Sequence, residues 1–402
     1  RMARILLQSR KNLFKKPGGD TVQIESLQRG LIKIGYEVDL SLELDPDLGS
    51  VDLVHCFNIT RLQETQLQIS NAVNQGTPAV LSPVFHNLTR YFRAGVYGWK
   101  RMITRTLSYD SLEQLRNLYL WAFNESDPRA CSQFLSLGYV ESGRRILSSI
   151  QGMVVNSHEE AREVFSFFQP PKTPHYELIP VGVSRSELDT VDERFCAQTR
   201  IRNYVLCVGR LEDLKNQVRV FKALENLPIS LVFIGHENSK HGSYIRKFHK
   251  LVRSHPNAHW FADLDRKTVL SAMKTARVHI LASMVETTGL SNLEAGYLGA
   301  NIVATENGYS REIFKNMAYY CDPEDLSSIR ESVSMAISKQ ASPLLKEYIT
   351  SRYTEEMCAL KHDRLYGKIL RDSRSSGGDF PKVLPGTPAL SVVQSRNLQE
   401  SS

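Results

Sequence analysis

Apolar strands alternate with amphipathic helices along this sequence in two successive series, and this alternation constrains the fold more than any other feature. The first series starts with an apolar strand at 5–7, a Gly-rich turn at 17–20, a helical pattern at 22–34 and a strand at 36–40. It continues with strands expected at 51–55, 78–85 and 152–157 and helices expected at 63–74 and 159–168. Because a helix that links two strands returns the chain to the same end of a sheet, this order predicts a parallel, doubly wound sheet.

A second series of the same kind starts with a strand at 204–208. Strands expected at 230–234, 258–261, 278–281 and 301–305 alternate in it with helices expected at 217–224, 244–253, 266–275 and 325–339. We therefore predict an α/β chain with two Rossmann-like domains, residues 1–183 and 184–353. The predictions for the remaining parts are a helical insertion at about 89–137 that contains a helix at 112–123, a long amphipathic helix at 354–371 and a disordered tail at 372–402, where Ser, Gly and Pro become frequent.

The length and the cysteine content narrow the class of protein. The 402 residues suffice for two domains with separate cores. The six cysteines are scattered without a CxxC pair, which favours a reducing compartment and argues against structural zinc. The first apolar run is too short for a signal peptide, and no stretch reaches the length of a membrane span, so we expect a cytoplasmic protein.

A formal net charge of +7 favours anionic partners, which include nucleotide phosphates, acidic membranes and nucleic acid. The sequence has no zinc-finger or RNA-recognition pattern, so we expect no nucleic-acid partner. Basic and aromatic residues are interleaved from Arg90 to Met102, and two interpretations of this segment stay open. It suits the surface of an anionic membrane, and it suits equally a helical insertion with a solvated basic face.

Two acids, Glu286 and Glu294, stand on either side of a Gly-Leu step. An apolar helical pattern follows Gly289, so one acid is expected in a loop and the other about one turn into a helix. The free N–H groups at the start of a helix favour an anion, and a glycine there lets a phosphate approach closely. The carboxylates would then hold neutral hydroxyl groups, so the pattern suits a sugar nucleotide.

Two cations, Arg210 and Lys215, follow the strand expected at 204–208 in a segment that starts at Gly209. The carboxyl ends of the strands face the ligand in an open parallel sheet, so this segment is expected there too. A guanidinium and an ammonium can neutralise a diphosphate as its bond to a sugar breaks. For an isolated pair of bases, a solvated loop would be the simpler interpretation.

Together the two segments resemble the E-x7-E and G-R-x4-K motifs of the family 4 retaining glycosyltransferases, also called glycosyl transferases group 1. The resemblance is most specific over 206–312 and looser over 1–183. It implies the GT-B fold, in which two Rossmann-like domains face each other across a cleft and the last helix returns to the first domain. It also implies a nucleotide-sugar donor and no divalent metal. The sequence departs from the family at Thr288, where an aromatic residue is usual, and at Asn301, where proline is usual.

The resemblance implies a role for each residue of the two motifs. Glu286 would bind hydroxyls of the transferred sugar and Glu294 would bind the ribose. The amides of Gly289 and Leu290 would lie against the phosphate. The two cations would stabilise the departing diphosphate, and Gly209 would belong to the donor site.

In the first domain, Gly18 and Gly19 stand where the family has a glycine-rich loop. A turn without Cβ atoms lets backbone N–H groups meet a phosphate or an acceptor. His86 follows the fourth strand and resembles a histidine that faces the transferred sugar in the family. Asn58 and Ser157, at the ends of neighbouring strands, are further candidates for the acceptor side.

Two other features concern acids. Asp263 and Asp265 form a DxD pattern, which we interpret as a helix N-cap rather than as a metal site, because a helix is expected from Arg266. Glu312 ends a loop pattern that resembles the family, and it is either a ligand of the site or a helix cap.

The sequence therefore predicts a retaining glycosyltransferase that moves a sugar from a nucleotide diphosphate to an acceptor hydroxyl. A UDP-sugar is the first expectation and a GDP-linked donor the second, and the acceptor is a glycan, a lipid-linked molecule or a protein. By analogy, the setting is polysaccharide or glycoconjugate biosynthesis in the cytoplasm, and peripheral docking on the inner face of a membrane is an open alternative. The competing interpretation is a non-catalytic GT-B subunit that binds glycan or a sister transferase.

Overall fold

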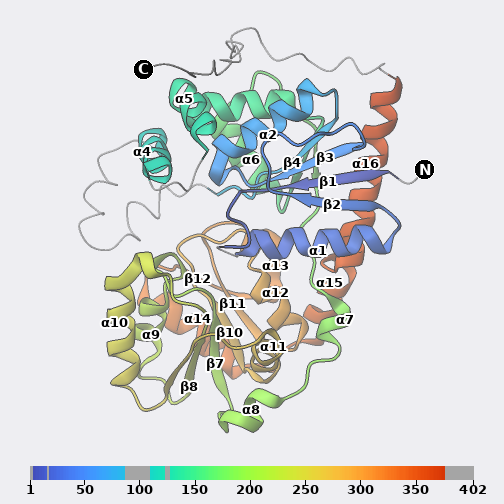
Figure 1. Ribbon diagram of the computed structural model, residues 1–402. Coiled ribbons are helices and arrows are strands. Elements are labelled where there is room, and N and C mark those ends of the chain that lie inside the picture. The colour runs from blue at the N-terminus through green and yellow to red at the C-terminus, as the bar shows by residue number, and fades with distance from the viewer. Residues whose placement is uncertain (1–2, 16–17, 87–108, 123–126, 376–402) are drawn as a thin grey trace, which may run out of the picture.

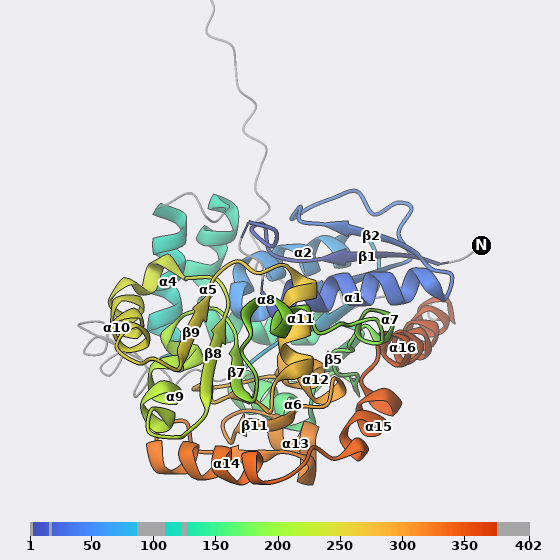
Figure 2. The same ribbon diagram turned by 90° about the horizontal axis from the view of Figure 1, so that it is seen from below.

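The computed structural model contains two parallel sheets, each covered by helices on both faces (Figures 1 and 2). It describes residues 3–15, 18–86, 109–122 and 127–375. The strands of the first sheet are β1 (Arg4–Gln8), β2 (Glu37–Ser41), β3 (Leu53–Phe57), β4 (Ala79–Ser82), β5 (Gly152–Val155) and β6 (Tyr176–Leu178). Those of the second are β7 (Tyr204–Val208), β8 (Ser230–Ile234), β9 (Ala258–Phe261), β10 (Val278–Leu281), β11 (Asn301–Thr305) and β12 (Tyr319–Cys321).

The strand orders show two doubly wound sheets. They are β2-β1-β3-β4-β5-β6 and β12-β11-β10-β7-β8-β9 over the described residues. Neighbouring strands pair in parallel throughout these two orders. This topology confirms the predicted fold class.

The helices of the first domain lie on both faces of its sheet. They are α1 (Gly19–Lys33), α2 (Leu62–Asn74), α4 (Tyr109–Ala122), α5 (Pro128–Ser149) and α6 (His158–Phe168), and they are joined by α16 (Glu355–Ser375) from the end of the chain. One apolar cluster contains side chains of α2, α5 and α6, such as Ile69 and Phe168. The other contains side chains of α1 and α16, such as Leu27 and Tyr366. Strand β3 is buried along its whole length because both of its faces are covered.

The second domain is built in the same way. Its helices are α7 (Arg185–Leu188), α8 (Arg194–Thr199), α9 (Gln217–Leu224), α10 (Gly242–Arg253), α11 (Arg266–Thr275), α12 (Leu290–Tyr297), α13 (Ser310–Phe314), α14 (Leu326–Ser338) and α15 (Pro343–Arg352). Side chains of α9, α10 and α14 fill one face of the sheet, with Phe221 and Phe248 among them. Side chains of α8, α11, α12 and α15 fill the other face, with Leu293 and Ile349 among them.

Over the described residues the chain crosses between the domains twice, and the two crossings lie side by side. Val183 N–H donates to Tyr353 C=O at 2.7 Å, and Glu355 N–H donates to Val183 C=O at 3.0 Å. Helix α16 then runs back along the first domain, where Glu355 pairs with Arg29 of α1 at 2.5 Å (Figure 1). Residues 1–183 and 184–353 stay our proposed domain limits.

Several expected boundaries differ from the structure at the ends of the domains. Helix α16 continues to Ser375, past its predicted end at 371, and the rest of the predicted tail lies outside the described residues. Helix α5 extends to Ser149, whereas the insertion was predicted to end at 137. The basic and aromatic segment Arg90–Met102 also lies outside the described residues. No helix in the described ranges is both long enough and apolar enough to span a bilayer.

Candidate active site

The order of the second sheet reverses between β7 and β10, and the predicted site lies at this point. Ligands of open parallel sheets bind where the order reverses, beyond the carboxyl ends of the strands. Arg210 follows β7, and Glu286 follows β10. The two loops are tied together, since Met284 N–H donates to Leu214 C=O at 2.8 Å.

Lys215 and Glu286 are in contact at the centre of this site. Lys215 ends a short 3-10 turn, Asp213–Lys215, and its Nζ lies 2.7 Å from Glu286 Oε2. Ser283 Oγ donates to the same oxygen at 2.9 Å. Burial alone would raise the pKa of Glu286, but Lys215 and Ser283 outweigh it, so the pKa lies below its ordinary value. The site therefore holds a carboxylate against an ammonium.

Arg210 is oriented differently from Lys215. Its side chain is 47% exposed, and its Nη2 lies 3.1 Å from Glu212 Oε1. Asn238 Nδ2 donates to the other oxygen of Glu212 at 2.7 Å. Gly209 packs beneath Lys215, since a Cβ at Gly209 would lie 3.6 Å from Lys215 Cγ. The loop thus presents one predicted cation to the buried acid and the other to solvent.

Helix α12 begins beside Glu286, as predicted. Gly289 is its N-cap with a φ of +65°, in the left-handed region that favours glycine. Asn292 N–H and Leu293 N–H both donate to Gly289 C=O, at 2.8 and 3.2 Å. The amide of Leu290 belongs to the first turn, in which N–H groups find no carbonyl inside their own helix. The start of α12 therefore offers N–H groups to an anion.

A buried pair beneath this helix start was missed by the sequence reasoning. His279, on β10, places Nδ1 2.7 Å from Asn292 Oδ1. Burial lowers the pKa of His279 to about 4, so the ring is neutral and Nδ1–H donates to the amide oxygen. The pair fixes the first turn of α12 on the strand. The signal in the sequence was His279 itself, a polar residue inside an otherwise apolar strand.

Glu294 is buried, and an arginine holds its carboxylate. Arg266, the first residue of α11, places Nη2 2.5 Å from Oε1 and Nη1 3.1 Å from Oε2 of Glu294. The same guanidinium lies 3.0 Å from Glu187 Oε2. Burial raises the pKa of Glu294 and Arg266 offsets only part of this effect, so the pKa lies above its ordinary value. The sequence reasoning had treated Arg266 only as the start of a helix.

The loop after β11 packs on the main chain of Glu286. Glu286 N–H donates to Asn307 C=O and Tyr309 N–H donates to Glu286 C=O, each at 3.1 Å. Gly308 between them has a φ of +100°, and a Cβ there would lie 1.9 Å from Glu286 O. Only glycine fits this approach. The position of Glu286 therefore depends on a second loop.

His86 reaches the site from the first domain. It follows Phe85 beyond the end of β4. A positive charge on His86 lowers the pKa of Glu286, but by less than Lys215 and Ser283 do. Across the same boundary, Tyr309 Oη donates to Phe85 C=O at 2.7 Å. The structure therefore brings the predicted histidine and the predicted acid into one region.

The predicted glycines of the first domain lie at the start of α1. Gly18 is the N-cap and Gly19 is the first helical residue. The next residue, Asp20, is bound by Arg10 Nε at 2.7 Å and by Asn58 Nδ2 at 3.0 Å. Asn58, a candidate for the acceptor side, thus belongs to a cluster with Arg10 and Asp20 that the sequence did not predict.

Three residues singled out by sequence are helix caps. The side chain of Asp265 accepts Thr268 N–H at 3.0 Å, which confirms the N-cap interpretation of the DxD pattern. Ser157 accepts Glu160 N–H at 2.9 Å as the N-cap of α6. Glu312 caps the same helix α6, although it belongs to the other domain.

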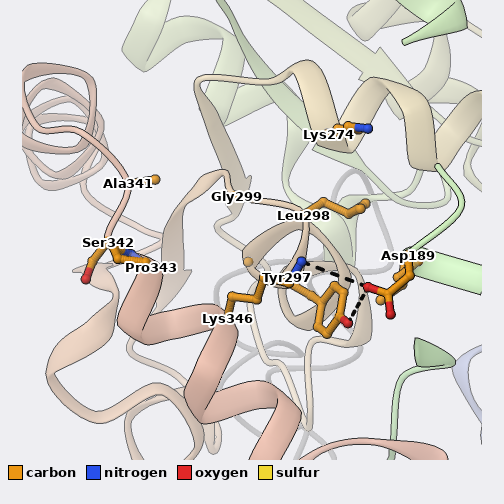
Figure 3. A pocket seen from close by; sticks show the side chains of 11 residues that line it. Asp189, Lys274, Tyr297, Leu298, Gly299, Ala341, Ser342, Pro343 and Lys346 are labelled. Atoms are coloured by element: carbon orange, nitrogen blue, oxygen red, sulfur yellow. Dashed lines mark hydrogen bonds and ion pairs between the residues drawn. The ribbon is translucent and has the colours of Figure 1, made fainter. Parts of the chain in front are cut away.

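A separate cavity of about 300 Å³ lies at the far end of α12 (Figure 3). There Tyr297 Oη donates to Asp189 Oδ1 at 2.7 Å, and Lys346 Nζ lies 3.9 Å from the same oxygen. No predicted site residue lines this cavity. It is therefore distinct from the contact between Lys215 and Glu286.

Comparisons with known proteins bear on the family and the fold. The family model for glycosyl transferases group 1 matches residues 195–353. Sucrose-phosphate synthase from Thermosynechococcus elongatus is similar with a TM-score of 0.69 and 15% identity, over 92% of this chain and 100% of that one. HepE from Anabaena, in complex with UDP and glucose, has a TM-score of 0.60 and 12% identity, over 91% of this chain and 100% of that one. The catalytic domain of starch synthase IV from Arabidopsis thaliana, bound to ADP and acarbose, has a TM-score of 0.62 and 11% identity, over 92% and 99%.

A search of curated proteins found no match. The three solved structures match almost the whole of this chain, so the likeness includes both sheets. The family match covers the domain that contains Lys215, Glu286 and Glu294. The chain therefore has the GT-B fold, and its residues 195–353 form a glycosyl transferases group 1 domain.

Proposed function

We propose that this chain moves a sugar from a UDP-sugar to a hydroxyl group of a glycan, lipid-linked or protein acceptor, with retention at the anomeric carbon. The contact between Lys215 and Glu286 at the reversal of the second sheet carries the proposal. In this proposal Lys215 is the cation for the diphosphate, and Glu286 beside it accepts hydrogen bonds from sugar hydroxyls. The uridine base is supported by HepE, whose solved structures contain UDP and UDP-glucose.

The diphosphate would lie between Lys215 and the start of α12. An ammonium has three N–H donors, and the contact with Glu286 uses one of them. The amides of Gly289 and Leu290 at the start of α12 would supply further donors. Arg210, whose exposed side chain lies beside Glu212, would reach the same phosphates. Charge that develops on the departing oxygen is then stabilised by donors already in position.

The two acids would bind the neutral parts of the donor. Glu286 has a lowered pKa, so it is ionised at neutral pH and accepts hydrogen bonds from hydroxyls of the transferred sugar. Glu294 would accept the ribose hydroxyls, and it would share its oxygens with Arg266. His86 would reach the transferred sugar from the first domain.

The reaction exchanges one bond at the anomeric carbon for another. The bond from C1 to the β-phosphate oxygen breaks, and the acceptor oxygen forms a bond to C1 on the same face. The proton of the acceptor hydroxyl passes to the departing phosphate oxygen. In this scheme the main contribution of the protein is to hold and stabilise the diphosphate.

Release of nucleoside diphosphate from UDP-, GDP- and ADP-sugars tests the proposal. We expect the fastest release from a UDP-sugar, and losses of about a hundredfold or more in Lys215→Ala and Glu286→Ala. Lys339→Ala, an exposed lysine of the same domain, is the control and should keep full activity. Circular dichroism and melting curves show whether each variant is folded.

Normal release by both site variants would contradict the site. No release from any donor by the folded wild type would favour the non-catalytic subunit instead.

A further inference from the structure

Tyr309 bridges the two domains beside the proposed reaction centre. Its side chain is 1% exposed. Its hydroxyl donates to Phe85 C=O at 2.7 Å and lies 2.8 Å from Glu163 Oε2 of α6. Its own N–H donates to Glu286 C=O at 3.1 Å. One residue thus joins the main chain of the proposed sugar-binding acid to the first domain.

The peptide groups around Phe85 are held from both domains. Phe85 N–H donates to Glu160 Oε1 at 2.8 Å, and Asn156 N–H donates to the other oxygen of Glu160 at 2.7 Å. Phe85 C=O receives the hydroxyl of Tyr309 from the opposite side. Since His86 is the next residue, this pair of contacts sets where its side chain begins.

Glu312 makes a second contact across the boundary, one turn further along the chain. Its two carboxylate oxygens accept His158 N–H at 2.7 Å and Glu159 N–H at 3.1 Å. These are the first amides of α6, which a carboxylate at a helix start stabilises both by hydrogen bonds and by its charge. Figure 2 shows α13, which contains Glu312, beside α6. Ser157 caps the next amide from within the first domain.

We propose that Tyr309 and Glu312 are positioning residues that lock the first domain onto the second and hold His86 against Glu286 during sugar transfer. This inference rests on the proposed function, because the placement of His86 matters only if the two side chains share a substrate. The groups proposed to hold the nucleotide part of the donor, Lys215, Gly289 and Glu294, lie within the second domain, so nucleotide binding does not need the contact. The transfer step does, because it uses groups from both domains.

Kinetics of Tyr309→Phe tests the inference, since phenylalanine keeps the buried ring and removes the bridging hydroxyl. We expect kcat to fall about tenfold and the donor KM to stay within about twofold of the wild-type value. A loss confined to kcat shows that the contact acts in the transfer step rather than in donor binding. Tyr320→Phe is the matched control: it removes a hydroxyl that donates to Lys315 C=O at 2.6 Å inside the second domain. An unchanged kcat in Tyr309→Phe, or an equal fall in Tyr320→Phe, would overturn the inference.

Hydrogen exchange tests the interdomain contact without any activity. In Glu312→Ala we expect the amides of His158 and Glu159 to exchange about tenfold faster, because each loses a charge-assisted hydrogen bond. Glu331→Ala, which removes an exposed acid from α14, should leave these amides unchanged. If the wild type transfers no sugar but Glu312→Ala speeds the exchange of these amides, the proposed function is wrong and the interdomain contact is confirmed. If these amides exchange equally fast in Glu312→Ala and the wild type, the inference fails whatever the activity.

Discussion

Replacing Lys215 by methionine should destabilise the protein in proportion to the ionisation of Glu286. Methionine retains much of the apolar stem of lysine but leaves Glu286, which is 9% exposed, without the cation at 2.7 Å. Breaking a buried ion pair by removing one partner costs about 3–5 kcal/mol. We expect the lower end, about 3 kcal/mol at neutral pH, because the Lys215 side chain is itself 22% exposed and the pair is partly solvated.

The effect of pH follows from the carboxyl group. In the wild type the pKa of Glu286 lies below its ordinary value of 4.5, so its contribution to stability is present above that pH and is lost as the pH falls through the folded pKa. In Lys215→Met burial becomes the main influence, and the pKa of Glu286 should rise above 4.5. The variant then loses stability as the pH rises from there. The difference in the free energy of unfolding between the wild type and Lys215→Met should therefore increase above about pH 4.5.

Urea unfolding of both proteins at about pH 4.5 and about pH 7.5 measures this difference in free energy. A third protein, Lys215→Met combined with Glu286→Gln, removes the charge and should recover much of the loss at the higher pH. A destabilisation by Lys215→Met of the same size at both pH values would refute the reasoning, because the cost would then come from packing rather than from the stranded carboxylate.

Three further predictions concern groups around the site. Gly308→Ala should lower the free energy of unfolding by about 3 kcal/mol, since its Cβ would lie 1.9 Å from Glu286 O at a φ of +100°; a melting temperature equal to that of the wild type would disprove this. Burial raises the pKa of Glu160 to about 7, so the free energy of unfolding of the wild type should fall by about 3 kcal/mol between pH 4.5 and 7, relative to that of Glu160→Gln. If urea unfolding gave the two proteins the same dependence of this free energy on pH, the prediction would be wrong. Arg266→Met should raise the donor KM several-fold with kcat nearly unchanged in steady-state assays, because it disturbs the proposed ribose acid Glu294 far from the reacting bond; a fall in kcat alone would show another role.

The central strands were predictable because they are apolar runs with clear limits. Expected and observed ranges coincide for the central strands β7, β8, β10 and β11, and also for the edge strand β9. Parallel strands covered on both faces read as continuous apolar stretches, so sequence alone reveals them. The edge strands β6 and β12 are short, and neither was predicted. Helix α5 was also missed, and Gly138, with a φ of 77°, interrupts its regularity.

The residues of the site divide in a similar way. Lys215, Glu286 and Gly289 belong to motifs that are local in sequence, so the resemblance reached them directly. Their partners are set by tertiary structure instead. Arg266 meets Glu294 from a different helix, 28 residues away. Tyr309 meets Phe85 across 224 residues and a domain boundary, a contact that no local pattern encodes.

Calorimetric titration of nucleoside diphosphates tests the central claim most directly. The claim is that Lys215 and the start of α12 hold a diphosphate where the second sheet reverses its order. We expect UDP to bind the wild type more tightly than GDP or ADP, and Lys215→Met to weaken it at least about tenfold, or about 1.4 kcal/mol, while Lys339→Met does not. Equal affinity of the wild type and Lys215→Met for UDP, or no binding of any of the three nucleotides, would contradict it.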